Sequence, residues 1–257
     1  MIRIDLTGKK DLCFIGDIHG GFRNMTWSLL SQWCLEDSIV VVCGDIGMGF
    51  YKRGYYSDEF QRMQTKLSEK NVTVVMFRGN HDNPEYFRAP KYGEYQFNGA
   101  YPNVFLVPDR TVLVTDHGKV ACFGGAVSID RSARTEDISW WHGENFAPLT
   151  ESEYADISKE SIDIVATHTC PLVCGPRFND AMGYEKSDKF LMSELMNERM
   201  DLDDLLKNIK ASNPLTKWFY GHFHGHYSDF IDGVQFTGMD MLKKSGADLY
   251  SLNGANI

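Results

Sequence analysis

Five short blocks of polar residues carry the side chains of this sequence that could do chemistry. Each block combines a carboxylate, an amide or an imidazole with a glycine or a proline, and the blocks are GDIHG at 16–20, GD at 44–45, RGNHD at 78–82, THTCP at 167–171 and GHFH at 221–224. Five of the eight histidines of the chain fall in these blocks. One such block is a common turn or surface pair, but the conjunction of five indicates a single site.

Each block contains or directly follows a short apolar run of the kind that forms a buried strand. The runs are short, β-branched and aromatic, which favours strands covered on both faces over helices, and they span 12–16, 39–43, 72–77, 162–167 and 216–220. Loops at the carboxyl ends of parallel strands meet in one crevice, where open α/β sheets bind ligands. The sequence therefore predicts that the five blocks meet at one edge of the fold.

The spacing within two blocks predicts paired ligands. Asp17 and His19 are two residues apart, as are His222 and His224. Residues two apart on extended backbone point to the same side, so each pair is expected to converge on one point.

The donor types of these blocks indicate divalent metals. Oxygen and nitrogen donors without thiolate, four of them imidazole, suit manganese, iron, zinc or nickel better than calcium, and the set is Asp17, His19, Asp45, Asn80, His168, His222 and His224. The set is too large for one tetrahedral ion. Two ions about 3.5 to 4 Å apart that share one carboxylate are a common device for displacement at phosphorus. We therefore expect a dinuclear centre that attracts phosphate.

Composition limits the classes of partner. With 26 basic and 35 acidic residues, the formal net charge is -9, which disfavours stable binding to nucleic acid or to an anionic membrane. The apolar stretch that follows the first lysines is too short for a signal peptide, and no run approaches the roughly 18 apolar residues of a membrane span. We expect a cytoplasmic protein that does not bind membranes.

Strand-like and helical patterns alternate along the first half of the chain. Residues 22–34 and 57–70 are predicted to be helices, the second with Ser57 as its N-cap. Such alternation is typical of a parallel sheet. Further strands are predicted at 111–115 and 119–123, and a helix at 186–210. Without a linker or an internal repeat, residues 1–257 are expected to form one domain.

In this order the five blocks resemble the signature blocks of the calcineurin-like metallophosphoesterase superfamily, and they span residues 16–224. The resemblance implies an α/β fold of four layers, with two mixed sheets flanked by helices and metals at the strand ends. It implies that one metal is held by Asp17, His19 and His224, that the other is held by Asn80, His168 and His222, and that Asp45 bridges them.

The resemblance also implies roles for the third block. His81 would be the catalytic histidine, and Asp82 would lie behind it and fix its tautomer. Gly79 would permit the bend before them. Arg78 is expected either to contact phosphate or to pair with a nearby carboxylate.

Two features separate the chain from the protein Ser/Thr phosphatases of the superfamily. Those enzymes carry GDxVDRG and GNHE, whereas this chain has GDIGMGF and GNHD, and its segment 124–144 resembles one found in small bacterial and phage metallophosphoesterases. This segment contains Arg131, Arg134, Trp140 and Trp141, which offer guanidinium forks for phosphate and flat faces for a base. We expect Arg131, Trp140 and Trp141 to bind substrate; the alternative is a solvated loop with one tryptophan in the core.

The expected activity is hydrolysis of a phosphate monoester or diester of a small or nucleotide-like substrate, by attack of a metal-bound hydroxide. The cofactors would be two divalent ions, with manganese favoured over iron, zinc, nickel or magnesium. The alternatives are a nuclease, a protein phosphatase and a metal-bound scaffold without catalysis.

Overall fold

The computed structural model describes residues 1–88, 100–176 and 183–253. Its helices are α1 (Phe22–Trp27), α2 (Arg53–Glu69), α3 (Glu151–Ile157) and α4 (Leu191–Ser212). Its strands are β1 (Ile2–Asp5), β2 (Asp11–Ile15), β3 (Ser38–Val42), β4 (Thr73–Met76), β5 (Val104–Leu106), β6 (Thr111–Thr115), β7 (Gly118–Phe123), β8 (Ile164–Thr167), β9 (Lys217–Tyr220), β10 (Tyr227–Ile231), β11 (Val234–Gly238) and β12 (Tyr250–Ser251).

The strands form two mixed sheets. The larger sheet has the order β1-β6-β7-β8-β9-β11-β10, and the smaller sheet has the order β12-β2-β3-β4-β5. Strands β2 to β5 are parallel to one another, and so are β7, β8 and β9. The carboxyl ends of both parallel sets therefore reach one edge of the molecule.

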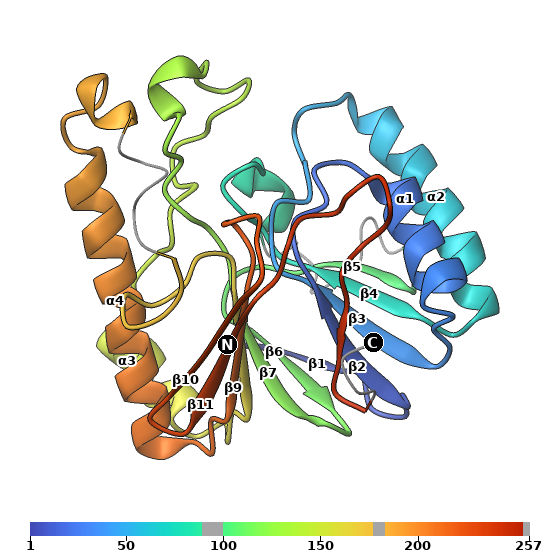
Figure 1. Ribbon diagram of the computed structural model, residues 1–257. Helices are drawn as coiled ribbons and strands as arrows, with labels where there is room; N and C mark the ends of the chain where they lie inside the picture. Colours follow the sequence, from blue (N-terminus) through green and yellow to red (C-terminus); the bar gives the residue numbers. More distant parts are fainter. Residues whose placement is uncertain (89–99, 177–182, 254–257) are drawn as a thin grey trace.

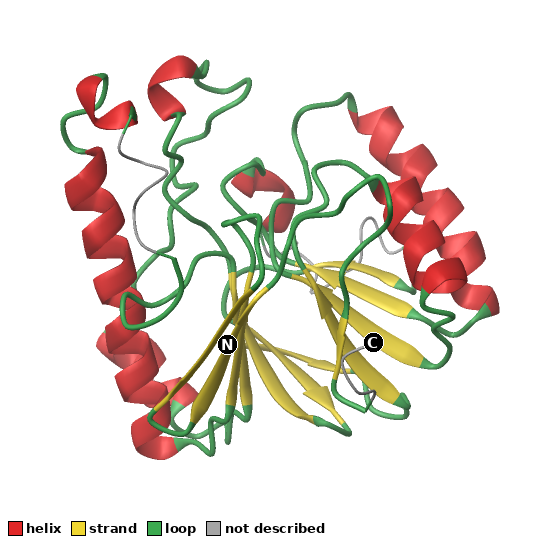
Figure 2. Ribbon diagram, in the orientation of Figure 1, coloured by secondary structure: helices red, strands yellow, loops and turns green. Residues whose placement is uncertain are grey.

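The two sheets pack face to face, and helices cover their outer faces (Figures 1 and 2). Helices α1 and α2 lie on the smaller sheet, and α3 and α4 lie on the larger one. This is the α/β arrangement of four layers that the resemblance predicts, so that prediction is confirmed.

Successive side chains of a strand point to opposite faces of its sheet, and this explains why the two sheets stack. In β2, Leu12 and Phe14 face the larger sheet, whereas Cys13 and Ile15 face α1 and α2. Phe14 stacks on Phe219 of the larger sheet, with ring centroids 3.8 Å apart. Strand β3 is buried along its whole length, as expected for a parallel strand covered on both faces.

Four expectations about single elements need correction. The predicted helix at 22–34 ends at Trp27 and continues as a π-helical turn, Ser28–Gln32. Helix α2 begins at Arg53, so Ser57 lies inside it and is not its N-cap. Tertiary contacts fix this earlier start, because the Tyr56 hydroxyl bonds the backbone of Gly47, Gly49 and Tyr51. The helix predicted at 186–210 is α4, which begins only at Leu191. The sequence did not predict β1, α3, β10, β11 and β12.

None of the helices in the described ranges is long and apolar enough to cross a lipid bilayer.

Candidate metal centre

The polar blocks lie together at the carboxyl ends of five strands. Asp17 and His19 follow β2, Asp45 follows β3, and Asn80 follows β4. His168 follows β8, and the block containing His222 and His224 follows β9. The smaller sheet thus supplies four of the predicted ligands and the larger sheet three, so the centre lies where the two sheets meet.

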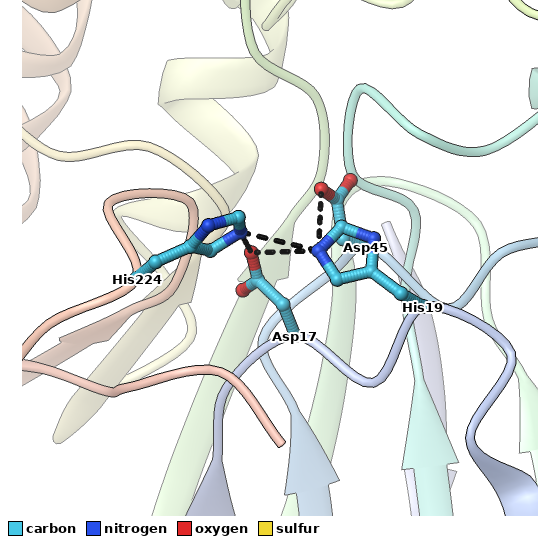
Figure 3. A group of neighbouring side chains, drawn as sticks. All are labelled: Asp17, His19, Asp45 and His224. Atoms are coloured by element: carbon cyan, nitrogen blue, oxygen red, sulfur yellow. Dashed lines mark hydrogen bonds and ion pairs between the residues drawn. The ribbon is translucent and has the colours of Figure 1, made fainter. Parts of the chain in front are cut away.

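The first donor group consists of Asp17, His19, Asp45 and His224 (Figure 3). Their potential ligand atoms all lie within 4.8 Å of one another. The Nε2 atom of His224 is 3.0 Å from Asp17 Oδ2 and 3.1 Å from His19 Nε2. His19 Nε2 is also 3.9 Å from Asp45 Oδ2. Two carboxylates and two imidazoles therefore converge on one small volume.

The second donor group consists of Asp45, Asn80, His168 and His222. Asn80 Oδ1 lies 2.9 Å from His168 Nε2 and 3.0 Å from His222 Nδ1. Asp45 Oδ1 lies 3.1 Å from His168 Nε2. Asp45 therefore offers one carboxylate oxygen to each donor group.

The backbone of the centre is strained at four of these ligands. His19, Asp45, His222 and His224 have positive φ angles of 43°, 51°, 70° and 47°, a region that costs a non-glycine residue about 1 to 3 kcal/mol and tends to mark functional sites. The extended geometry expected of the two i, i+2 pairs is therefore absent. In consequence His222 and His224 do not converge: His222 joins the second donor group and His224 the first.

Two glycines leave room for the closely packed ligand side chains. A Cβ atom at Gly79 would lie 2.1 Å from Asp45 Oδ1, and one at Gly221 would lie 2.3 Å from Asp17 Oδ1. Both glycines are thus needed for the approach of two buried carboxylates.

The residues present fit divalent cations. Asp17 Oδ2 is buried and makes no hydrogen bond in the described part of the chain, although His224 Nε2 lies close to it. Burial alone would raise the pKa of Asp45, but the imidazoles of His168, His81 and His19 hold it well below its usual value. Two buried carboxylates beside imidazole nitrogens form a set of oxygen and nitrogen donors that suits a divalent cation.

Comparison with known families decides the identity. The model of the family described as calcineurin-like phosphoesterase matches residues 11–226. The chain belongs to this family. It is accordingly a phosphoric ester hydrolase of a metal-dependent family, and the first donor group is its candidate metal-binding cluster.

Solved structures show the same fold at low sequence identity. The structure of TT1561 of Thermus thermophilus is 14% identical, with a TM-score of 0.55 and coverage of 90% of this chain and 89% of that one. A dimetal phosphatase from Danio rerio is 10% identical, with a TM-score of 0.55 and coverage of 94% and 91%. Among curated proteins, no sequence matches significantly.

In this metallophosphoesterase, His81 lies beside Asp45. Its backbone N–H donates to Asp45 Oδ1 at 2.7 Å, and its Nε2 atom is 4.0 Å from Asp45 Oδ2. Nε2 also lies 2.6 Å from Nη2 of Arg134. Burial and the Arg134 charge lower the pKa of His81, although Asp45 opposes them, so the neutral ring accepts a hydrogen bond from the guanidinium through Nε2.

The expectation that Asp82 fixes the His81 tautomer is wrong. The buried Asp82 carboxylate accepts hydrogen bonds from the backbone N–H groups of Ile46, Gly47, Met48 and Gly79, at 2.7 to 3.0 Å. Asp82 therefore ties the loop after β3 to the loop after β4. It positions the backbone just after Asp45 and just before Asn80.

Arg78 does not bind substrate, because its guanidinium is fully used elsewhere. It is buried, pairs with Asp109 through Nε and Nη2, and donates its other N–H groups to the carbonyls of Gly143, Glu144 and Asn145. The alternative expectation, an ion pair with a nearby carboxylate, is confirmed.

Arg131 is also committed to the scaffold. It pairs with Asp188 at 2.6 Å and with Glu194 of α4. These contacts anchor the 124–144 segment to the start of α4. The expectation that Arg131 reaches the substrate phosphate is therefore wrong.

The two tryptophans lie outside the cavity at the centre. Trp141 is buried and packs edge-on against Phe50, with centroids 5.2 Å apart, which confirms the alternative of one tryptophan in the core. Trp140 lines a neighbouring depression together with Arg131 and His142. Their predicted contact with substrate at the centre is not supported.

A cavity of about 590 Å³ opens onto both donor groups, and Asp45, Asn80, His81, His222 and His224 form part of its lining. Arg134 is the cation of the 124–144 segment that lines it. Sequence reasoning noted the Arg131 and Arg134 pair but could not tell which one faces the site. A volume of this size is typical of small-molecule sites.

Ser128 is a second residue that the sequence did not reveal. Its buried hydroxyl accepts a hydrogen bond from Asn80 Nδ2 at 2.9 Å, which turns Asn80 Oδ1 toward His168 and His222. The Ser128 backbone N–H is held in turn by the buried carboxylate of Glu144. Ser128 is thus a positioning residue for the second donor group.

Replacing Ser128 with alanine is expected to weaken metal binding at the second donor group about 10- to 100-fold, the usual cost of losing a group that orients a ligand. Affinity at the first donor group should change little. Titration of the apo-protein with Mn²⁺ in a competing chelator measures both. Ser132→Ala, in an exposed serine of the same segment, is the matched control, and equal second-site affinity in the two variants would refute the role of Ser128.

Proposed function

We propose that the protein is a dinuclear-metal phosphoesterase that hydrolyses a phosphate ester of a small or nucleotide-like molecule. The observation that carries this proposal is the placement of Asp45, which offers Oδ2 to the first donor group and Oδ1 to the second. A carboxylate shared in this way suits two ions held side by side. Manganese is the favoured metal, because imidazole and carboxylate donors together suit it.

When bound, the two ions would supply Lewis acidity toward a phosphoryl group and would lower the pKa of water. The chain supplies the remaining functions. Asp17 and Asp45 bring two negative charges and Asn80 brings none, so the centre stays positive toward an anionic ester. His81 lies at the edge of the cavity, close enough to contact the ester.

The cavity favours small substrates over polymers. Its volume of about 590 Å³ suits one small molecule, and the net charge of -9 opposes tracking along a nucleic acid. We therefore favour a small-molecule phosphoesterase over a nuclease and over a protein phosphatase. A scaffold without catalysis is disfavoured by the presence of the whole ligand set and of His81.

Turnover of p-nitrophenyl phosphate and bis-p-nitrophenyl phosphate tests the proposal. The EDTA-treated protein should be inactive, and Mn²⁺ or Ni²⁺ should restore hydrolysis of at least one ester. His117→Ala should behave as the parent, because His117 contacts the backbone of Lys9 away from the centre. Absence of turnover with Mn²⁺, Ni²⁺ and Mg²⁺ would favour the scaffold.

A further inference from the structure

Two arginines line the cavity, Arg134 and Arg199, and they differ in what their guanidinium groups bind. Arg199 donates to the backbone carbonyls of Cys170, Pro171, Cys174 and Pro176. It therefore holds the loop after β8 against α4. Its Nε and both Nη atoms are bound by the fold, as are those of Arg78, whereas Arg131 pairs with Asp188 and Glu194 and does not line this cavity.

Arg134 retains donors. Its Nη2 atom bonds Asp130 at 2.7 Å and His81 at 2.6 Å. Its Nη1 atom has one long contact, 3.4 Å, with the Ser139 carbonyl. Among the described residues, Nε has no hydrogen-bond partner. Arg134 thus faces the cavity beside His81, and part of its guanidinium group has no hydrogen-bond partner among the described residues.

The ion pair with Asp130 explains how this guanidinium is held in place. Asp130 is four residues before Arg134 and also lines the cavity. Because its carboxylate takes one N–H of Nη2, the other N–H of Nη2 is directed to His81. The ion pair therefore holds the Arg134 guanidinium at the edge of the donor groups, where a phosphoryl group would bind.

The chemistry of a guanidinium matches this position. It stays charged near neutral pH and donates charge-assisted hydrogen bonds to phosphoryl oxygens, and on Arg134 the Nε and Nη1 atoms are available to donate them. The loop after β3 contains no cation within Ile46–Phe50, and Arg78 is sequestered. Among the described residues of the cavity, Arg134 is the cation with donors to spare for an oxygen that the metals do not take.

We propose that Arg134 binds the phosphoryl group of the substrate and gives the enzyme a preference for phosphate monoesters over diesters. This inference rests on the proposed phosphoesterase function. A monoester presents three terminal oxygens and up to two negative charges near neutral pH, because its second pKa is about 6. A diester presents two terminal oxygens and one charge, so it gains less from a cation beyond the metals.

The rest of the cavity indicates the organic part of that monoester. Ile129, Leu195 and Phe223 contribute apolar surface, and Tyr184 adds a phenol ring. Such a wall suits an apolar or aromatic group better than a second charged group. The substrate class is therefore a monoester of a small alcohol or phenol with an apolar or aromatic body.

Binding of inorganic phosphate to the Mn²⁺-loaded protein tests the role of Arg134 without turnover. Arg134→Ala should raise the dissociation constant measured by calorimetry about 10- to 100-fold, the value of one or two charge-assisted hydrogen bonds. The dissociation constant of Arg134→Lys should lie between those of the parent and of Arg134→Ala, because lysine keeps the charge but lacks the planar set of guanidinium donors. Arg62→Ala, which removes the same charge from an exposed arginine that pairs with Glu59 of α2, should bind as the parent. Metal content must equal that of the parent in every variant.

Hydrolysis of p-nitrophenyl phosphate and bis-p-nitrophenyl phosphate tests the preference. Both esters release p-nitrophenolate, so a difference between them reports the phosphoryl group and not the leaving group. Arg134→Ala should lower kcat/KM about 10- to 100-fold on the monoester and distinctly less on the diester. Equal losses on both esters, or unchanged phosphate binding in Arg134→Ala, would overturn the inference. A parent protein that binds no phosphate and cleaves neither ester would instead overturn the proposed function.

Discussion

Replacing Asp45 with asparagine is expected to remove more than one metal equivalent per chain and to lower kcat roughly 10³-fold. Asp45 offers an oxygen to each donor group, so its charge serves both ions. Lewis-acid stabilisation worth several kcal/mol would be lost with them. Elemental analysis of the purified protein and turnover of p-nitrophenyl phosphate measure the two effects.

The design of this substitution keeps the fold in place. Asparagine is isosteric with aspartate and retains an oxygen that can accept the His81 backbone N–H, which Asp45 Oδ1 accepts at 2.7 Å. Asp204→Asn is the matched control, because the exposed Asp204 pairs with Lys207 on α4 outside both donor groups. His168→Ala should mainly empty the second donor group. Two metals per chain in Asp45→Asn would show that Asp45 does not bridge.

The second large effect concerns His81. His81→Ala is expected to lower kcat roughly 10² to 10⁴-fold on an alkyl phosphate, the usual range for a positioned acid, and distinctly less on p-nitrophenyl phosphate. An alkoxide needs a proton as it leaves, whereas p-nitrophenolate leaves well without one. A phosphoryl group bound by Arg134 would replace His81 as the partner of that guanidinium, so that Nε2 could take up a proton from solvent and pass it to the leaving oxygen.

The outcome separates two roles for the imidazole. If His81 only steadies Arg134, which lies 2.6 Å away, losses should be equal on the alkyl and aryl esters and should match those of Arg134→Ala. Such a result, with metal content unchanged, would eliminate His81 as the proton donor. His117→Ala controls for the loss of a histidine elsewhere.

Substitution of Asp82 is expected to affect the hydrolysis of the alkyl and aryl phosphates differently from substitution of His81. Its carboxylate binds four backbone N–H groups and not the imidazole. An asparagine there would turn an N–H₂ group toward backbone donors, so Asp82→Asn should act through stability and metal content. It follows that the adjacent residues His81 and Asp82 have separate functions.

The sequence by itself determined the class of fold and the kind of centre. Apolar runs ending in polar blocks predict parallel strands, and such strands deliver their loops to one edge because their hydrogen-bonded ladders all point the same way. The donor types then indicate divalent metals, since no thiolate is among them. Asp17, Asp45, Asn80 and His168 could be placed in one site on these grounds, and the family match over residues 11–226 agrees.

Short or weakly patterned elements were harder to foresee. Strand β12 has two residues, too few for a periodic signal, and β1 has a single buried residue. Both are edge strands, paired with β2 and β6 respectively. The first turn of α2 depends on the Tyr56 hydroxyl binding the loop after β3. These elements are set by contacts between segments and not by their own propensities.

Tertiary structure alone decided the backbone geometry at the ligands and which cations face the cavity. Positive φ angles at His222 and His224 replace the extended backbone that their spacing predicts, although the family resemblance already implied that these two histidines belong to different donor groups. Arg131 and Arg134 are equivalent in sequence, yet Arg131 is held by Asp188 and Glu194, whereas Arg134 reaches His81, 53 residues away along the chain. The physical reason is that side-chain direction in a loop is fixed by packing against distant segments, whereas periodicity reports only on residues that are neighbours along the chain.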